Sequence, residues 1–345
     1  MSKKKEAETA PAISAREELE KNIAKKFGIN FLDGSYIRNN RKILIPTTPS
    51  LDISLKGGVP EGSWNLISGR PKTGKTTLAL QIAANAQAMG RHVYYLNIEH
   101  RFDFKNLSTV RHFQTTPDLF TLIQSQKEKI LSSEDMLNIG CEIAASHENA
   151  VMIFDSISSL CSAKELASEM GEMGRADGPR MFGKFCRKNE AIVPINNILF
   201  IGILHHIANT SGYGSPWMED GGNKIQFQCD SKFVHKRSSD WEQNGKKIGQ
   251  IVEWYTAYNA NGAPGDIVKT YLRYGFGYDD VWEIISLALD FGLIAKAGAW
   301  YSYYPEEGNL DNLVKTQGQA GLHEYFNAHM DELAILHDKV KAMAM

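Results

Sequence analysis

Four mostly apolar runs lie in the middle of the chain, and glycine or polar residues follow each of them. They cover residues 64–68, 92–98, 151–155 and 198–204. A run that is apolar on both faces predicts a parallel strand covered by helices on its two sides. Together the runs predict an α/β fold built on a doubly wound, mostly parallel sheet.

Segments with helical spacing lie between these runs. Apolar residues recur at that spacing from Leu78 to Ala86 and stop at Gly90, and a further helix is expected near residues 134–147. Thr116 and Pro117 have the N-cap and N1 pattern of a helix start, so the pattern predicts another helix there. Strands and helices therefore alternate as far as residue 204.

The last third of the chain carries strand patterns and then helical ones. Strands are predicted at residues 232–236, 249–258 and 267–274, with Asn244–Gly245 as a hairpin turn. Asp279 and Asp280 would cap a helix that runs to about residue 291. We expect a core domain over residues 46–278 and a small C-terminal α/β lobe over residues 279–345.

The residues before the core carry a polar tail and one helix. Residues 1–13 are expected to be disordered because they offer little apolar surface to bury. Ser14 and Glu17 form a capping box that opens a helix to about residue 27. A helix this small needs a packing partner, so we interpret residues 14–45 as a docking segment for a neighbouring subunit.

The octapeptide at residues 69–76 matches the phosphate-binding pattern GxxxxGK[ST] between a predicted strand and a predicted helix. Its glycines let backbone N–H groups approach phosphate oxygens, and the helix N-terminus adds partial positive charge. Lys75 would reach the β and γ phosphates, and the Thr76 hydroxyl would hold Mg²⁺. The predicted nucleotide contacts are Gly69, Arg70, Pro71, Lys72, Thr73, Gly74, Lys75, Thr76 and Thr77.

Charge and cysteine content exclude some function classes. Lys and Arg number 38 and Asp and Glu 40, so net charge gives no nucleic-acid signal and any DNA affinity must come from local placement. The four cysteines are scattered, which favours a reduced intracellular protein over a disulfide framework or a zinc site. Without an apolar run that could span a membrane or a secretory signal, we expect a cytoplasmic location.

Two carboxylates follow predicted strands and are candidates for the chemistry. Asp155 ends an apolar strand, where a carboxylate can meet Mg²⁺ beside the phosphate loop, although such a residue also often caps the next helix. Glu99 follows another strand and could orient the water that attacks the γ-phosphate, or could form an ordinary surface salt bridge. His205 and His206 end a third strand. Neighbours on a strand point to opposite faces, so a γ-phosphate sensor is a better reading of this pair than a metal site.

Two glycine-rich stretches, residues 166–178 and 207–224, also follow strands and would emerge at the edge of the sheet where the phosphate loop lies. A basic helical stripe lies between them, formed by Arg180, Lys184, Arg187 and Lys188. Such a stripe can be an ordinary solvated face. Beside two glycine loops it predicts a groove that follows a phosphate backbone.

With these features the chain resembles the RecA family of DNA recombinases, including its UvsX-like phage members, over residues 14–345. The similar segments are residues 50–62 before the phosphate loop, 98–103, 221–227, 274–277 and 297–303. The resemblance implies a helical filament on single-stranded DNA, with ATP and Mg²⁺ at subunit interfaces and homologous duplex DNA as the second partner in strand exchange. It implies that the N-terminal helix docks on the adjacent subunit.

The resemblance also implies roles for individual residues. Glu99 would activate the attacking water, with His205 as the γ-phosphate sensor where bacterial relatives have glutamine. Asp103 would touch the adenine, and Tyr274 would pack near the base. The two glycine loops would hold the DNA, whose backbone would be contacted by Arg180, Arg187, Gly221, Gly222 and Asn223.

One departure from the family pattern bears on turnover. Tyr258 and Ala260 stand where the family has two lysines that reach the neighbour's γ-phosphate. Hydrolysis is therefore expected to be slow unless another cation substitutes, and the candidates are Lys246, Lys247 and Lys269. Two alternatives to a strand-exchange recombinase stay open: an ATP-switched single-strand-binding filament with little hydrolysis, and a RecA-fold motor of the helicase type.

Overall fold

The computed structural model describes residues 15–103, 107, 109–169, 177–209, 213–222, 224–243, 245–305 and 312–344. The expected N-terminal tail, Ser14 and Asn223 lie outside this part of the chain, as do most of the first glycine loop and part of the second. The chain divides into two compact units, Met1–Lys42 and Ile43–Met345.

The first unit contains two helices, α1 (Ala15–Phe27) and α2 (Gly34–Asn39). Glutamates in the first turn of α1 and lysines in its last turn complement the helix dipole. Asp33 caps α2 by accepting a hydrogen bond from the Ser35 backbone N–H at 2.8 Å. No residue of either helix is buried, so the helices that the structure describes in this unit form no core of their own.

A 10-stranded mixed sheet organises the second unit, and its order is β12-β11-β10-β9-β3-β7-β6-β4-β5, with β8 paired to β7. The strands from β9 to β5 are parallel, and the other neighbouring pairs are antiparallel. The strands are β3 (Trp64–Gly69), β4 (Val93–Asn97), β5 (Phe120–Ile123), β6 (Val151–Asp155), β7 (Leu199–Ala208), β8 (Trp217–Asp220), β9 (Ser231–Gln243), β10 (Lys246–Tyr258), β11 (Ile267–Arg273) and β12 (Gly277–Tyr278). The predicted α/β fold with a mostly parallel core is confirmed.

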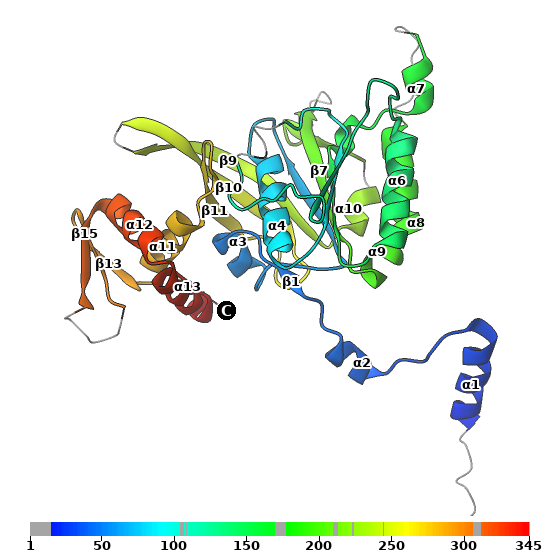
Figure 1. The fold of residues 1–345 in the computed structure, drawn as a ribbon, viewed down its shortest axis with the longest axis horizontal. Coiled ribbons are helices and arrows are strands. Elements are labelled where there is room, and N and C mark those ends of the chain that lie inside the picture. Colours follow the sequence, from blue (N-terminus) through cyan, green and yellow to red (C-terminus); the bar gives the residue numbers. More distant parts are fainter. Residues whose placement is uncertain are drawn as a thin grey trace, which may run out of the picture. The chain divides into compact units, whose positions relative to one another are not determined.

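Alternate residues of the central strands belong to two different apolar clusters, as the period of a strand requires. In β6, Ile153 packs in one cluster and its neighbours Met152 and Phe154 in the other. Helix α4 (Lys75–Ala88) covers the first face, and α6 (Ser133–Ser146) and α8 (Gly178–Asn189) cover the second (Figure 1). Shorter helical segments complete this part: α3 (Pro49–Ser54), η1 (Ile157–Ser159), α7 (Ala163–Ala167), α9 (Ile192–Ile195) and α10 (Lys224–Gln228).

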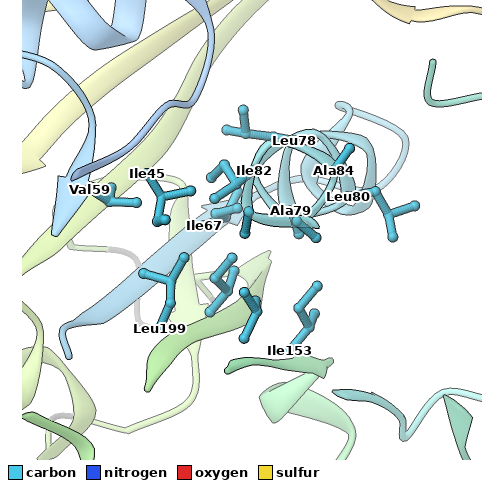
Figure 2. Packing of buried hydrophobic residues seen from close by; sticks show 14 of the residues in the cluster. Ile45, Val59, Ile67, Leu78, Ala79, Leu80, Ile82, Ala84, Ile153 and Leu199 are labelled. Carbon is cyan, nitrogen blue, oxygen red and sulfur yellow. The ribbon is translucent and has the colours of Figure 1, made fainter. Parts of the chain in front are cut away.

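The helix after the phosphate loop is anchored by the first cluster. Figure 2 shows α4 lying over the sheet, with Ile82 and Ala79 facing Ile67, Ile153 and Leu199. These side chains are fully or almost fully buried. The small ribbon of β1 (Leu44–Ile45) and β2 (Val59–Pro60) adds Ile45 and Val59 to the same cluster. Tight packing therefore holds the helix N-terminus, and with it the phosphate loop, against the sheet.

The C-terminal lobe has its own apolar cluster and a three-stranded antiparallel sheet. Its elements are α11 (Asp280–Asp290), β13 (Ile294–Ala297), β14 (Trp300–Tyr303), β15 (Val314–Gln317), α12 (Gly318–Ala328) and α13 (Met330–Ala344). Asp279 caps α11, as expected, by accepting from the Trp282 N–H at 3.0 Å. Its carboxylate also accepts from Arg273 of β11 and His323 of α12, at 2.7 Å and 3.0 Å, and so links the sheet to the lobe.

Two local predictions differ from the structure. Thr116 and Pro117 do not start a helix, because the chain makes a turn there and enters edge strand β5, whose hydrogen bonds to β4 override the capping pattern. The second glycine stretch, expected as a functional loop, contains strand structure. Strand β7 continues to Ala208 and pairs with β8, which lies inside that stretch. Among the described residues all four cysteines are free, and no helix is long and apolar enough to cross a membrane.

Candidate nucleotide site

The phosphate loop connects the last residue of β3, Gly69, to the first residue of α4, Lys75. Gly74 and Lys72 have φ angles of +86° and +62°, a left-handed conformation in which glycine is unstrained. A Cβ on Gly69 would lie 2.6 Å from the Cβ of His235, so this strand end tolerates only glycine. The loop therefore turns sharply beside β9 and presents its backbone at the start of α4.

The loop forms one wall of a cavity of about 290 Å³. Its lining consists of Pro71, Lys72, Thr73, Gly74, Lys75, Thr76, Thr77, Tyr95, Asn97, Glu99, Arg101, Phe102, Asp155 and His205. The structure thus brings together the loop, both predicted carboxylates and the predicted histidine. They meet because β3, β4, β6 and β7 are parallel and end at the same edge of the sheet.

Lys75 is buried and has little compensating charge. Its ammonium donates a hydrogen bond to the Arg70 carbonyl at 2.8 Å. Burial lowers the pKa of Lys75 to about 8, and the carboxylates of Asp155 and Glu99 only partly oppose this effect. A buried ammonium whose pKa is depressed in this way is suited to an anionic ligand, which would restore its charged form.

Thr76 and Asp155 supply oxygen atoms suited to Mg²⁺. The Thr76 hydroxyl donates to Asp155 Oδ2 at 2.8 Å, and the Tyr95 hydroxyl donates to the same oxygen. Burial raises the pKa of Asp155, and these two hydrogen bonds oppose the shift. Mg²⁺ prefers hard oxygen ligands and commonly takes few from the protein, so this pair fits the ion predicted from the sequence.

Glu99 is held as a carboxylate by several neighbours. His205 Nε2 and Ser156 Oγ donate to its Oε1, and Ser159 Oγ lies 3.3 Å from the same atom. The hydrogen bond from His205 is the largest cause that lowers the pKa of Glu99 to about 2. A carboxylate this acidic accepts hydrogen bonds and can orient a water molecule.

Several residues in or next to the cavity lining were not predicted from the sequence. Tyr95 stacks on Phe102, with ring centroids 4.1 Å apart, and its hydroxyl fixes Asp155. Ser156 and Arg101 contact the two oxygens of Glu99. Ser156 directly follows Asp155 and Arg101 lies two positions after Glu99, so proximity to the predicted carboxylates was the available signal.

Comparison with known proteins supports this reading of the cavity. Residues 12–279 match the family model of the RecA N-terminal domain, and residues 282–345 match that of the RecA C-terminal domain. The chain belongs to the RecA family of DNA recombinases. Similar proteins include Protein RecA of Phytoplasma mali, 30% identical over 297 residues that cover 84% of this chain and 85% of the relative. Protein RecA of Aquifex aeolicus is 27% identical over 330 residues, with 94% and 90% covered.

Two residues that the RecA resemblance placed at the base do not line the cavity within this single chain. Asp103 follows the cavity residue Phe102, and Tyr274 lies half-exposed after β11, where the ammonium of Lys247 is 5.9 Å from its ring. Lys247 also pairs with Asp240 at 2.6 Å. The roles of Asp103 and Tyr274, and of Lys246, Lys247 and Lys269 as substitute cations, stay predictions.

Of the predicted DNA-contacting residues that the structure describes, the arginines lie on α8 and the glycines directly follow β8. All four basic residues of the predicted stripe are exposed on α8. Gly222 has a φ of +75°, and a Cβ there would lie 2.7 Å from Pro179, next to Arg180. Gly221 packs against Leu204, so both glycines also have a packing reason to be glycine. Asn223 lies outside the described residues.

Strand β8, which directly precedes these glycines, contacts residues in and next to the phosphate loop. Ser68, just before the phosphate loop, donates to Glu219 of β8 at 2.7 Å, and Lys232 pairs with the same carboxylate at 2.7 Å. The Arg70 guanidinium lies 5.4 Å from the ring of Trp217. His205 and His206 point to different partners, Glu99 and Glu219, as expected for neighbours on a strand. Direct contacts therefore join the phosphate loop region to β8.

Proposed function

We propose that this protein is an ATP-dependent recombinase that forms a helical filament on single-stranded DNA and catalyses homologous pairing and strand exchange. The convergence of Lys75, the Thr76–Asp155 pair and Glu99 on one cavity carries the proposal. The match to the RecA family over nearly the whole chain supports it.

In this proposal the residues of the cavity have different roles in binding and hydrolysing ATP. Lys75 and the backbone N–H groups of the loop bind the phosphates. Thr76 and Asp155 would hold Mg²⁺, which neutralises charge on the phosphates when it is bound. Glu99 orients the attacking water. His205 donates a hydrogen bond either to Glu99 or to the γ-phosphate, depending on which acceptor is nearer.

Hydrogen bonds between His205, Ser158 and β8 support a switch in which the bound nucleotide changes the affinity for DNA. The backbone N–H of His205 donates to Ser158 Oγ at 2.9 Å, and that hydroxyl donates to the Asp220 carbonyl of β8. A γ-phosphate that draws His205 away from Glu99 would therefore move β8 and, with it, Gly221 and Gly222. DNA affinity would then depend on which nucleotide is bound.

The partners in this proposal are further copies of the chain, single-stranded DNA and a homologous duplex. Helix α1 and the residues after it expose Leu19, Phe27, Leu32 and Ile37, each more than half exposed. Apolar side chains that their own unit leaves uncovered support the docking role proposed for residues 14–45. Arg180 and Arg187 on α8 would contact the DNA backbone, together with Gly221, Gly222 and Asn223.

One observation favours a second candidate, a filament that binds and protects single strands with little hydrolysis. Tyr258, at the end of β10, is 41% exposed and lies 5.6 Å from the Lys232 ammonium, and Ala260 carries no charge. Neither residue could present a cation to a neighbour's γ-phosphate. In this candidate ATP acts as a conformational ligand and turnover is slow.

Binding to a labelled single-stranded oligonucleotide tests the proposal. Anisotropy would be measured with ATP, with a non-hydrolysable analogue and with ADP, using Lys75→Ala as the control. Tight cooperative binding with the first two and weak binding with ADP is expected. DNA affinity that is the same with ATP, with the analogue and with ADP would contradict the switch. Strand exchange between a circular single strand and a linear duplex then separates the recombinase from the protective filament.

A further inference from the structure

Arg101 brings a positive charge to the part of the cavity lining that contains Glu99. It follows β4 by four residues and lines both the nucleotide cavity and an adjoining, more open cavity of about 460 Å³. The two cavities share Pro71, Glu99, Arg101 and His205. Arg101 therefore lies at the end of the site where Glu99 would hold the attacking water.

The two lysines of the cavity lining are already placed elsewhere. Lys75 is buried and donates to the Arg70 carbonyl, and Lys72 belongs to the loop itself. Both therefore belong to the phosphate loop or the start of α4. Among the residues described, Arg101 is the lining cation that contacts Glu99, near which negative charge would spread over the γ-phosphoryl oxygens during transfer.

The contact that holds Arg101 in this structure is easily exchanged. Its Nη1 lies 3.5 Å from Glu99 Oε2, and its side chain is 83% exposed. The partners of the other oxygen, Oε1, are His205, Ser156 and Ser159. An exposed guanidinium at this distance is hydrated and weakly held, so a rotamer change can carry it to another anion at little cost.

We propose that Arg101 is a catalytic residue that acts in cis, releasing Glu99 and contacting the γ-phosphate in the transition state. The inference rests on the proposed ATPase function. In the reaction the water oxygen forms a bond to the γ-phosphorus while the bond from phosphorus to the β–γ bridging oxygen breaks, and that electron pair stays on ADP. The water proton passes to a phosphate oxygen and then to solvent. Arg101 neither gains nor loses a proton.

A cis role for Arg101 explains both how Glu99 becomes available and which cation replaces the one missing at Tyr258 and Ala260. The guanidinium leaves the carboxylate at the moment the anion arrives, so Glu99 becomes available to orient water only when ATP is present. The cation that Tyr258 and Ala260 do not provide is then supplied within the same chain. A planar guanidinium can also contact two phosphoryl oxygens at once, which the point charge of a lysine does less well.

The test compares Arg101→Ala and Arg101→Lys with Arg237→Ala in the full chain. Arg237 is a matched control because it is also an exposed arginine, 72% accessible, paired with a glutamate at 2.8 Å, but on the β9–β10 hairpin. Hydrolysis of ATP with single-stranded DNA and the Kd of a fluorescent ADP would be measured for each. A drop in kcat of about 10³-fold or more is expected for Arg101→Ala, the range known for an arginine in this role.

The remaining readouts separate catalysis from structure. ADP affinity should stay unchanged in both Arg101 variants, Arg101→Lys should recover part of the rate, and Arg237→Ala should match wild type. Millimolar guanidinium should partly restore Arg101→Ala. A kcat in Arg101→Ala equal to or above wild type would overturn the inference and make Arg101 only a resting partner of Glu99. A wild-type chain that neither binds nor hydrolyses ATP would instead overturn the proposed function, and the inference with it.

Discussion

The imidazole of His205 donates a hydrogen bond to the carboxylate of Glu99, although 106 positions separate the two residues in the chain. His205 also lies opposite Asp220 in the β7–β8 pair. One residue thus touches the candidate water-orienting group through its side chain and the candidate DNA-binding segment through its backbone. This double contact joins the candidate nucleotide site to the candidate DNA-binding segment through one residue.

Replacing Glu99 by glutamine should separate binding from turnover. The amide keeps the size of the side chain and can still accept from Ser156, but it cannot orient water as a carboxylate does. We expect nucleotide-dependent binding to single-stranded DNA to persist while hydrolysis falls by about 10² to 10⁴-fold. Parallel anisotropy and phosphate-release measurements check this. Loss of binding in Glu99→Gln would assign Glu99 a structural role.

Replacing His205 should weaken the coupling between the two ligands. His205→Ala removes the side-chain donor but keeps the β7–β8 backbone pairing, so ATP should still bind while the gain in DNA affinity over ADP shrinks. His205→Gln, which retains an N–H donor, should keep part of that gain. The ratio of the DNA Kd with ADP to that with a non-hydrolysable analogue is the measurement. An unchanged ratio in His205→Ala would rule out this connection.

The depressed pKa of Lys75 predicts that ATP affinity depends on pH. The pKa is about 8 in the nucleotide-free chain, and bound phosphate should raise it. Binding therefore takes up a proton above about pH 8, so affinity should be level near pH 7 and fall by up to about tenfold per unit above pH 8. Titrations with a fluorescent ATP from pH 7 to 9.5 test this. Lys75→Arg, which stays charged, should lack the slope, and the same slope in both would refute the assignment.

Glu283 should limit stability at alkaline pH. It is fully buried, accepts from the Ser50 N–H at 2.7 Å and from the Thr48 hydroxyl at 3.0 Å, and its other carboxylate oxygen has no partner among the described residues. Burial is the main cause that raises its pKa to about 7. A raised carboxyl pKa means that stability present at low pH is lost as the pH rises towards 7.

Glu283→Gln should therefore raise the Tm at pH 8 and change it little at pH 5. The gain in unfolding free energy at pH 8 would be up to about 3 kcal/mol, which corresponds to the size of the pKa shift. Thermal unfolding at the two pH values measures it, with the exposed Glu324→Gln as the control. An equal effect of Glu283→Gln at both pH values would show that packing, not ionisation, is responsible.

Arg180 and Arg187 should contribute to DNA binding through phosphate contacts. Each alanine variant is expected to weaken single-strand binding regardless of base sequence and to reduce the slope of log Kd against log salt by about 0.7. Salt titrations with two oligonucleotides of different sequence test this, and Arg237→Ala provides a charge-matched control. A reduced affinity with an unchanged salt slope would mean that the residue does not contact a phosphate.

The parts of the candidate site that were predicted from the sequence consist mainly of residues that are contiguous in the chain. The strand, loop and helix around residues 64–88 follow from local apolar patterning and from the glycines at positions 69 and 74, and the structure has them as expected. Asp155, the last residue of β6, and Glu99, two residues after β4, were also expected at one edge of the sheet, because parallel strands place their carboxyl ends there. The helix expected at Thr116 was wrong, because pairing with β4 outweighs a two-residue capping signal.

The sequence by itself determined the phosphate loop, the alternation of strands and helices and the capped start of α11, since each depends on neighbours within one or two turns of chain. The tertiary structure alone decided that Arg101 shares a carboxylate with His205, that Tyr95 fixes Asp155, and that β8 pairs with the end of β7. The contacts of His205 with Glu99 and of Tyr95 with Asp155 join residues 106 and 60 positions apart. They exist because the sheet order brings four strand ends to one edge, and no local pattern encodes that order.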